Sequence, residues 1–191
     1  MTVRRGLLVV TSGPSGVGKD TIIERLLALD TNLTYSVSCT TRAPRPGEVD
    51  GVHYTFVSRE KFEELVRQDY FLEHASYNGN LYGTPTGAVE AARAAGQDIL
   101  LKIEVQGAQQ VRKRVSDGLF IFIAPPNTEE LARRQSGRSS VNEQDITERL
   151  RIAEKEMTYA RDYDHVVVND DLERAVSELL GIIRAARERQ T

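Results

Sequence analysis

The chain has 191 residues, of which 40% are hydrophobic, and it carries a formal net charge of −3 and one cysteine, Cys39. This length favours one domain with its own buried core, the charge provides no general attraction to nucleic acid, and a single cysteine excludes an intrachain disulfide. The apolar run around Leu7 to Val10 is too short for a secretion signal or a membrane span. We therefore expect a soluble, cytoplasmic protein without nucleic-acid or membrane partners.

The first predicted unit is a strand, a glycine-rich turn and a helix. The apolar run 6–11 is typical of a buried strand, and apolar residues then recur at helical spacing over 19–30. A second strand is predicted over 35–39. The segment 40–51 holds two prolines and two glycines, so it cannot form a regular element.

The next segment has hairpin character. A strand is predicted over 53–57, and Ser58 can cap a helix over 59–68. Asn78-Gly79 divides the segment 71–83 into two short runs, which is the strongest local signal for a hairpin.

Strands and helices alternate again in the second half of the chain. The predicted elements are a helix over 85–95 that ends at Gly96, a strand over 99–105, a helix over 107–115, a strand over 119–124, a helix from Asn127 to about 135, a polar loop over 135–144, a charged helix to about 161, a strand over 165–169 and an amphipathic helix from Leu172.

This order of elements predicts one α/β domain in which helices flank a parallel sheet. We expect the core to comprise 1–37, 85–125 and 163–191. The segment 38–84 is expected to form an inserted lobe with a mixed or antiparallel sheet, and 126–162 a helical lid.

A phosphate-binding loop is predicted at Gly13-Pro14-Ser15-Gly16-Val17-Gly18-Lys19, which follows a strand and precedes a helix. Its glycines let backbone N–H groups converge on phosphate oxygens, and the helix N-terminus favours an anion. Lys19 can reach the β- and γ-phosphates of a nucleotide. A glycine-rich turn with an exposed lysine is the alternative, but it does not account for the flanking strand and helix.

The residue after Lys19 departs from this motif, because Asp20 stands where a hydroxyl normally touches Mg²⁺. A carboxylate can hold Mg²⁺ or one of its waters, although it repels bare phosphate. Thr21 keeps a hydroxyl one position later. Alternatively, Asp20 only complements the helix dipole, and both explanations stay open.

A second anion site is suggested by Arg42 and Arg45, which stand three residues apart in a proline-flanked loop with Tyr54 beyond them. Two guanidiniums and a phenol suit a second phosphate group. On composition alone, a solvated basic loop is the simpler explanation.

Taken together, these segments resemble guanylate kinase. The resemblance runs over nearly the whole chain, through the phosphate loop, SVSCTTRAPRPGEVDGVHY (36–54), FLEHASYNGNLYGTP (71–85), IEVQGAQQVR (103–112) and VVVND (166–170). It implies a P-loop kinase of purine nucleotide metabolism that uses Mg²⁺ and ATP to phosphorylate GMP, and also dGMP, to the diphosphate. ATP would then bind at Gly13, Pro14, Ser15, Gly16, Val17, Gly18, Lys19, Asp20 and Thr21, with Asn169 near the adenine.

The same resemblance implies how GMP is held. Its phosphate would bind Arg42, Arg45, Tyr54 and Tyr82, and its guanine would be read by Ser38, Glu73 and Thr84. Guanine presents N1–H and N2–H₂ donors and an O6 acceptor, so an ionised Glu73 can accept from the donors while a hydroxyl donates to O6. Adenine would leave Glu73 unpaired, which is how a polar site rejects an analogue. Without the resemblance, Glu73 would be interpreted as an exposed strand acid.

The lid is implied to supply cations to the transferring phosphoryl group through Arg134, Arg138 and Arg149. Ser136 stands where relatives often carry an arginine, and Lys102 stands where many carry a carboxylate. Glu104, two residues after Lys102, then serves either the guanine or the metal.

Two other functions remain possible on the sequence. A kinase of the same fold could act on another nucleotide or on a phosphorylated sugar, which a panel of substrates would decide. A non-catalytic protein-binding module related to guanylate kinase is the second alternative, but such modules tend to lose the phosphate loop, which is intact here.

Overall fold

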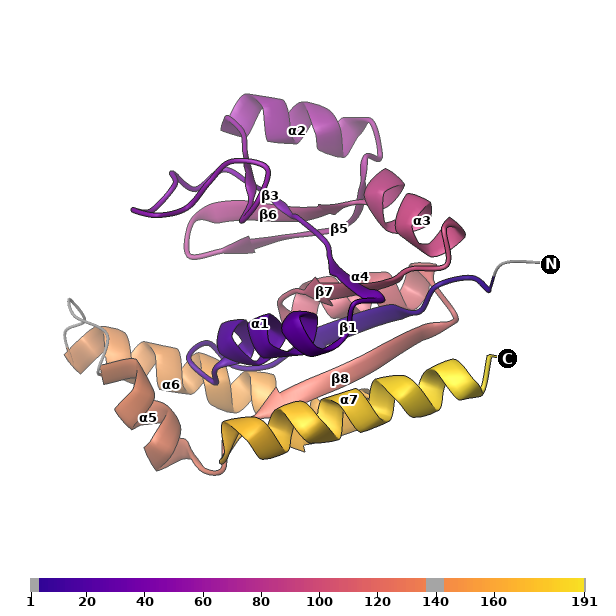
Figure 1. The fold of residues 1–191 in the computed structure, drawn as a ribbon. Coiled ribbons are helices and arrows are strands. Elements are labelled where there is room, and N and C mark those ends of the chain that lie inside the picture. Colours follow the sequence, from indigo (N-terminus) through magenta and orange to yellow (C-terminus); the bar gives the residue numbers. More distant parts are fainter. Residues whose placement is uncertain (1–3, 137–142, 191) are drawn as a thin grey trace.

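The computed structural model describes residues 4–136 and 143–190, with the backbone alone over 135–136 and 143–149. Its core is a sheet of five parallel strands (Figure 1). In spatial order these strands are β2 (Leu33–Tyr35), β7 (Asp98–Lys102), β1 (Leu8–Ser12), β8 (Gly118–Ala124) and β9 (His165–Val168). The central strand β1 and its neighbour β8 are rich in Leu, Val, Ile and Phe and almost wholly buried, as a parallel sheet covered on both faces requires.

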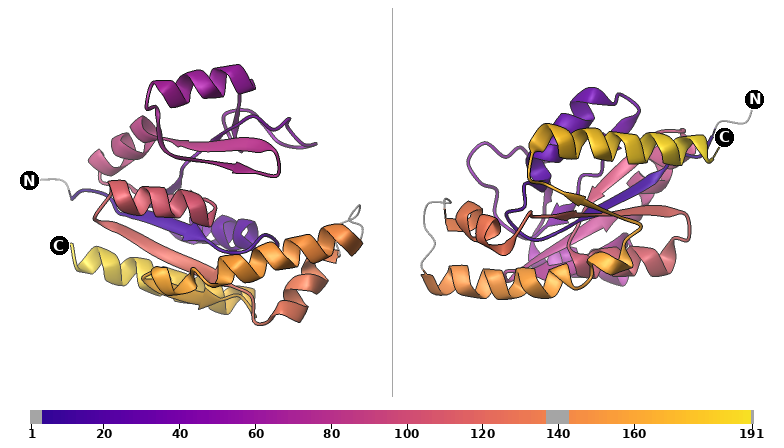
Figure 2. Two further views of the ribbon diagram at one scale, coloured as in Figure 1. Left: turned by 180° about the vertical axis from the view of Figure 1, so that it is seen from behind. Right: turned by 90° about the horizontal axis from the view of Figure 1, so that it is seen from below.

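Helices cover both faces of this sheet. On one face α1 (Lys19–Leu29) and α7 (Leu172–Glu188) share a hydrophobic cluster with β1 and β8. On the other face α3 (Thr86–Ala94) and α4 (Val105–Arg114) pack through Val89 and Val111 (Figure 2). The predicted fold class is therefore confirmed. In the described part of the chain, no helix has both the length and the apolarity to cross a membrane.

The second sheet has four strands and lies above the core in Figure 1. Their order is β4 (Thr55–Phe56), β3 (Cys39–Thr40), β6 (Asn80–Pro85) and β5 (Phe71–Tyr77), with β3 and β4 parallel and the other pairs antiparallel. The turn at Asn78 and Gly79 has φ values of 48° and 76°, as the hairpin prediction requires. Helix α2 (Arg59–Arg67), capped by Ser58 as predicted, packs on this sheet through Phe62.

Two further helices occupy the segment that is predicted to form a lid. Helix α5 (Thr128–Ser136) begins after Asn127, whose Oδ1 accepts a hydrogen bond from the backbone N–H of Glu130. It contacts α6 (Glu143–Met157), and both lie near the phosphate loop (Figures 1 and 2). The charged helix was expected to continue to about residue 161. It ends at Met157 because the chain tightens into single turns and the 3₁₀ helix Ala160–Asp162.

The strand predicted over 35–39 is wrong as a single element. Residues 33–35 pair with the core sheet, whereas Cys39 and Thr40 belong to the second sheet. The backbone N–H of Ser36 still bonds to Leu100, but the carbonyl of Ser38 already accepts from Thr55. An apolar run cannot reveal that its two ends pair with different partners. Likewise, β7 ends at Lys102 rather than 105, because α4 already begins at Val105.

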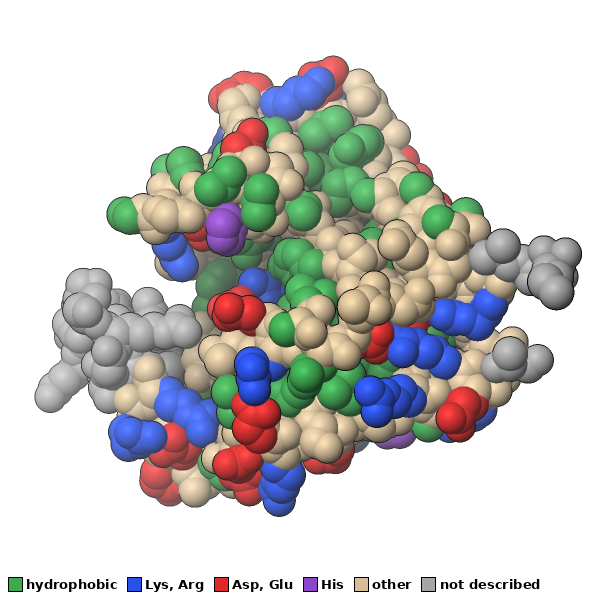
Figure 3. All heavy atoms as spheres, in the orientation of Figure 1, with side chains coloured by type: hydrophobic (Ala, Val, Ile, Leu, Met, Phe, Trp, Pro, Cys, Tyr) green, Lys and Arg blue, Asp and Glu red, His purple; other side chains and the backbone are tan. Residues whose placement is uncertain are grey.

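Figure 3 shows one face of the molecule in the orientation of Figure 1. Acidic and basic side chains are interspersed over the lower part of this face, and neither sign gathers into a continuous patch.

Candidate active site

The phosphate loop lies at the carboxyl end of β1 and leads into α1. Two of its glycines are required by close contacts as well as by positive φ. A Cβ on Gly13 would lie 2.1 Å from the carbonyl oxygen of Ile123, and one on Gly18 would lie 2.6 Å from Nδ2 of Asn169. The buried Asn169 amide donates to the carbonyl of Val17 at 2.7 Å. Asn169 thus supports the loop itself, and its predicted proximity to the adenine stays a prediction.

Lys19 bends back over this loop. Its Nζ donates to the carbonyl oxygens of Gly13 and of Pro14, the latter at 3.1 Å. Burial lowers the pKa of Lys19, and the neighbouring carboxylates of Glu104, Glu156 and Asp20 oppose that effect. The ammonium is therefore held at the mouth of the loop by groups that a bound phosphate could replace.

In the inserted lobe, Arg42 is held by a residue that the sequence did not single out. Its NH1 and NH2 donate to the two carboxylate oxygens of Glu48 at 2.9 and 2.8 Å, and the backbone N–H of Arg45 donates to the same carboxylate at 2.7 Å. The hydrogen bonds from Arg42 lower the pKa of Glu48 to about 2. The guanidinium carbon of Arg42 also lies 5.4 Å from the ring centroid of Tyr54. The fork of Arg42 is thus presented in the planar geometry that also suits a phosphate.

Glu73 and Thr84 face each other across the β5–β6 pair. Thr84 Oγ1 donates to Oε1 of Glu73 at 2.6 Å, and both residues are buried. Burial raises the pKa of Glu73 to about 7, although the hydrogen bonds from Thr84 oppose it. Ser38 is also buried, and it lines the same cavity as Glu73. The alternative of an exposed strand acid is therefore wrong.

A cavity of about 190 Å³ joins the two predicted phosphate sites. Its lining includes Ser15, Gly16, Gly18 and Lys19 of the phosphate loop and Ser38, Arg42, Arg45, Tyr54, Glu73 and Tyr82 of the inserted lobe. Asp20 of α1, Lys102 of β7 and Glu104 line it as well. Thr84 is buried against Glu73, and Thr21 is exposed on α1. Most of the site residues predicted from the sequence therefore line one cavity.

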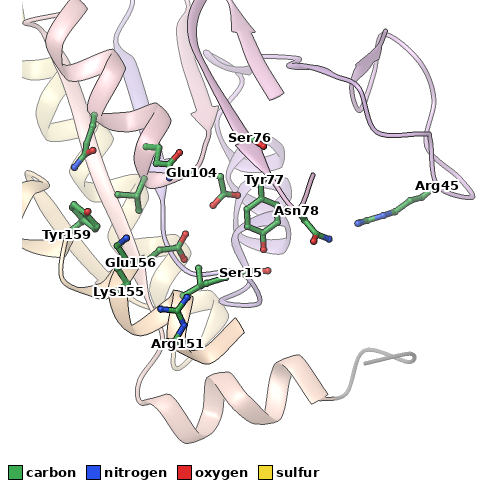
Figure 4. A pocket seen from close by; sticks show the side chains of 14 residues that line it. Ser15, Arg45, Ser76, Tyr77, Asn78, Glu104, Arg151, Lys155, Glu156 and Tyr159 are labelled. Atoms are coloured by element: carbon green, nitrogen blue, oxygen red, sulfur yellow. The ribbon is translucent and has the colours of Figure 1, made fainter. Parts of the chain in front are cut away.

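A larger cavity of about 740 Å³ adjoins this space and shares Ser15, Arg45, Tyr77 and Glu104 with it. Figure 4 shows its two sides: Arg151, Lys155 and Glu156 come from α6, and Ser76, Tyr77 and Asn78 come from the β5–β6 hairpin. Helix α6 and the β5–β6 hairpin thus face each other across an open cavity.

Glu156 is the second acidic residue that sequence reasoning missed. Burial and the adjacent carboxylate of Glu104 together raise its pKa to about 7, although Lys19 opposes them. The residue has no sequence signal of its own, because its position depends on the packing of the end of α6, where Met157 lies against Val105 and Phe122.

Of the three predicted lid cations, the structure describes Arg134. Its Nε donates to Glu130 at 2.7 Å, and its NH1 lies 3.3 Å from the carbonyl oxygen of Val17 in the phosphate loop. Arg138 lies outside the described residues, as does the side chain of Arg149.

Two of the residues that depart from the expected motifs contact each other. Nζ of Lys102 lies 2.5 Å from Oδ1 of Asp20. Asp20 and Glu104 supply carboxylate oxygens to the cavity that Lys19 lines, which is the donor type that Mg²⁺ prefers. In the described part of the chain, no three His, Cys, Asp or Glu side chains gather as a complete metal site. Phosphate oxygens and waters would have to complete the coordination.

Comparisons with known proteins agree with this geometry. The guanylate kinase family model matches residues 5–186. The guanylate kinase of Desulfitobacterium hafniense is 49% identical over 187 residues, covering 98% of this chain and 94% of that protein. A guanylate kinase of Thermus thermophilus is 52% identical over 185 residues, covering 97% of this chain and 84% of that protein.

A solved structure extends the agreement to the fold. The crystal structure of guanylate kinase from Anaplasma phagocytophilum superimposes with a TM-score of 0.81 at 37% identity, covering 97% of this chain and 88% of that one. The family model spans almost the whole chain, and the phosphate loop shares one cavity with the residues predicted to bind the acceptor. This protein therefore belongs to the guanylate kinase family.

Proposed function

We propose that this chain transfers the γ-phosphoryl group of Mg·ATP directly, in line, to a phosphate oxygen of GMP, and that dGMP is a second acceptor. The overall reaction, ATP-dependent phosphorylation of GMP to GDP, is that of its family. The observation that supports the proposed residue roles is the single cavity lined by Lys19 on one side and by Arg42, Arg45 and Tyr54 on the other.

On the donor side, the phosphate loop binds the β- and γ-phosphates. Lys19 exchanges the carbonyls of Gly13 and Pro14 for phosphate oxygens. Phosphoryl transfer needs alignment and charge stabilisation more than covalent chemistry. Arg134 is close enough to the loop to contribute, and Arg138 and Arg149 are proposed from the family resemblance.

On the acceptor side, Arg42 exchanges the carboxylate of Glu48 for the phosphate of GMP. Arg45, Tyr54 and Tyr82 complete that site. No general base is needed, because a phosphate oxygen of GMP is already anionic near neutral pH. The guanine is read by Glu73, together with Ser38 and Thr84, and dGMP carries the same base and phosphate.

The oxygen donors beside the phosphate loop fit Mg²⁺. Asp20 and Glu104 would hold the ion or its waters. When bound, Mg²⁺ neutralises charge on the β- and γ-phosphates.

Closure of the lid and the inserted lobe over both substrates is part of this proposal. The cavity of about 740 Å³ between α6 and the β5–β6 hairpin is open, and water in it would hydrolyse ATP. Closing it would exclude that water. The cytoplasmic location stays a prediction.

The stereochemistry of transfer tests the mechanism. ATP made chiral at the γ-phosphorus with three oxygen isotopes should give GDP with inverted configuration, because one in-line displacement inverts phosphorus. Retention would mean two displacements through a phosphorylated enzyme and would contradict the proposal. A parallel reaction with dGMP should show turnover with the same inversion.

A further inference from the structure

The ion pair between Asp20 and Lys102 joins two parts of the fold at the reacting centre. Asp20 lies in the first turn of α1, directly after Lys19, and Lys102 is the last residue of β7. The two side chains meet at 2.5 Å, with 76% of the Asp20 side chain exposed but only 21% of the Lys102 side chain. The lysine is therefore the fixed member of the pair, and the carboxylate reaches it from the solvent side.

The side chain of Lys102 lies against two aromatic rings and one carboxylate. Its Nζ lies 5.8 Å from the ring centroid of Tyr35 and 5.9 Å from that of Tyr54. Favourable contacts of this kind hold an ammonium in place at an aromatic wall.

Tyr54 relates Lys102 to the acceptor phosphate site. The guanidinium of Arg42 and the ammonium of Lys102 both contact this ring, at 5.4 and 5.9 Å from its centroid. Lys102 also lines the cavity that contains Lys19. It is thus a cation placed between the phosphate loop and the residues that hold the acceptor.

We propose that Lys102 is a catalytic cation of this enzyme, which exchanges Asp20 for the acceptor phosphate and the phosphoryl group in transit when both substrates are bound. The inference rests on the proposed function and adds a residue to it. Asp20 acts as a positioning residue that holds the ammonium beside the phosphate loop.

Electrostatics supports this exchange. In the free enzyme Lys102 neutralises the carboxylate directly after Lys19, which would otherwise repel an approaching phosphate. An ion pair with a largely exposed partner is weak. The clustered negative charges of two nucleotides therefore compete successfully for the ammonium.

Steady-state kinetics of charge variants tests the proposal, with GMP and ATP varied separately. Lys102→Met should lower kcat by about 100-fold, the loss typical of removing one preorganised charge stabiliser, and should raise KM for GMP more than KM for ATP. Lys102→Arg should recover most of the rate. Asp20→Asn should lose less than about tenfold, because it leaves the cation in place. Lys113→Met, which changes an exposed lysine at the end of α4, is the matched control and should behave as the parent.

The inference would be overturned if the Lys102→Met enzyme had kcat and KM for GMP within twofold of the parent. It would also be overturned if Lys102→Met and Asp20→Asn lost the same amount of turnover, because the ion pair would then have only a structural role. If Lys102→Met does not fold, the double variant Asp20→Asn, Lys102→Met carries the test, because it leaves neither charge unpaired. The double variant should lose as much turnover, and near-parent turnover would overturn the inference. Failure of the in-line mechanism would instead appear in the parent enzyme, as retention at phosphorus.

Discussion

Gly107 of α4 lies directly against the carboxylate of Glu73: a Cβ added at Gly107 would lie 2.2 Å from Oε2 and 2.9 Å from Cδ. Thr84 holds the other oxygen of the same carboxylate. The absence of a side chain at residue 107 therefore helps to fix the group that is proposed to read guanine.

Gly107→Ala should displace Glu73 and weaken GMP binding. Charge-assisted hydrogen bonds contribute about 1.5–3 kcal/mol each, so KM for GMP should rise roughly 10- to 100-fold while KM for ATP changes little. Gly181→Ala is the control, because Gly181 lies in α7 with no atom near the added Cβ. An alanine favours the helix at either position, and a thermal melt of both variants separates any destabilisation by the clash at residue 107 from the loss of GMP binding. Unchanged GMP kinetics in Gly107→Ala would contradict the role of this contact.

The affinity for GMP should depend on pH through Glu73, because burial raises the pKa of this carboxyl group to about 7. The guanine donors require the ionised carboxylate. Below pH 7 the free enzyme holds a proton on Glu73 that GMP must displace, so affinity should fall with decreasing pH, by at most about tenfold per unit. Above pH 7 that dependence should level off. Calorimetric titration with GMP from pH 5.5 to 8.5 measures the effect.

Glu73→Gln provides the control for this profile, because its amide does not ionise. The GMP phosphate also gains a proton near pH 6, and the variant retains that contribution. The difference between the two profiles should therefore isolate Glu73. Parallel profiles would mean that the carboxylate does not control binding in this range.

Arg42→Ala and Arg45→Ala should each raise KM for GMP much more than KM for ATP. The fork of Arg42 is already aligned by Glu48 and Tyr54, and a lysine cannot reproduce bidentate geometry. Lys replacements should therefore also impair GMP use. Initial rates with each substrate varied in turn measure the effect, and a selective loss of ATP affinity would show that the acceptor site is misplaced.

Lys19→Ala should lower kcat/KM by at least ~100-fold, since it removes a principal charge stabiliser from a preorganised site. The residue sits in a ligand-binding loop, so circular dichroism should show a folded variant. Near-parent turnover by that folded variant would refute the role assigned to Lys19.

Features that depend on a few neighbouring residues were predictable from the sequence. The phosphate loop, the Asn78-Gly79 turn and the Ser58 cap each follow from a few adjacent residues, and the structure confirms their placement. Family resemblance added the acceptor residues, most of which line the same cavity.

Features that depend on tertiary contacts were not predictable in this way. Glu48 matters because it binds Arg42, and Glu156 because α6 brings it to Glu104. Asp20 and Lys102 were two separate departures in the sequence, and only the parallel packing of β1 beside β7 makes them a pair. The prediction of a single strand over 35–39 was wrong for the same reason. The sequence of a strand does not show which other strands it pairs with.

The choice of acceptor tests the central claim most directly. ADP release should be measured with ATP and each nucleoside monophosphate in turn, at the same concentration. GMP should stimulate release strongly and dGMP more weakly, while AMP, CMP and UMP stay near background, because the buried Glu73 and Thr84 pair complements guanine. Equal turnover of AMP and GMP would contradict the account.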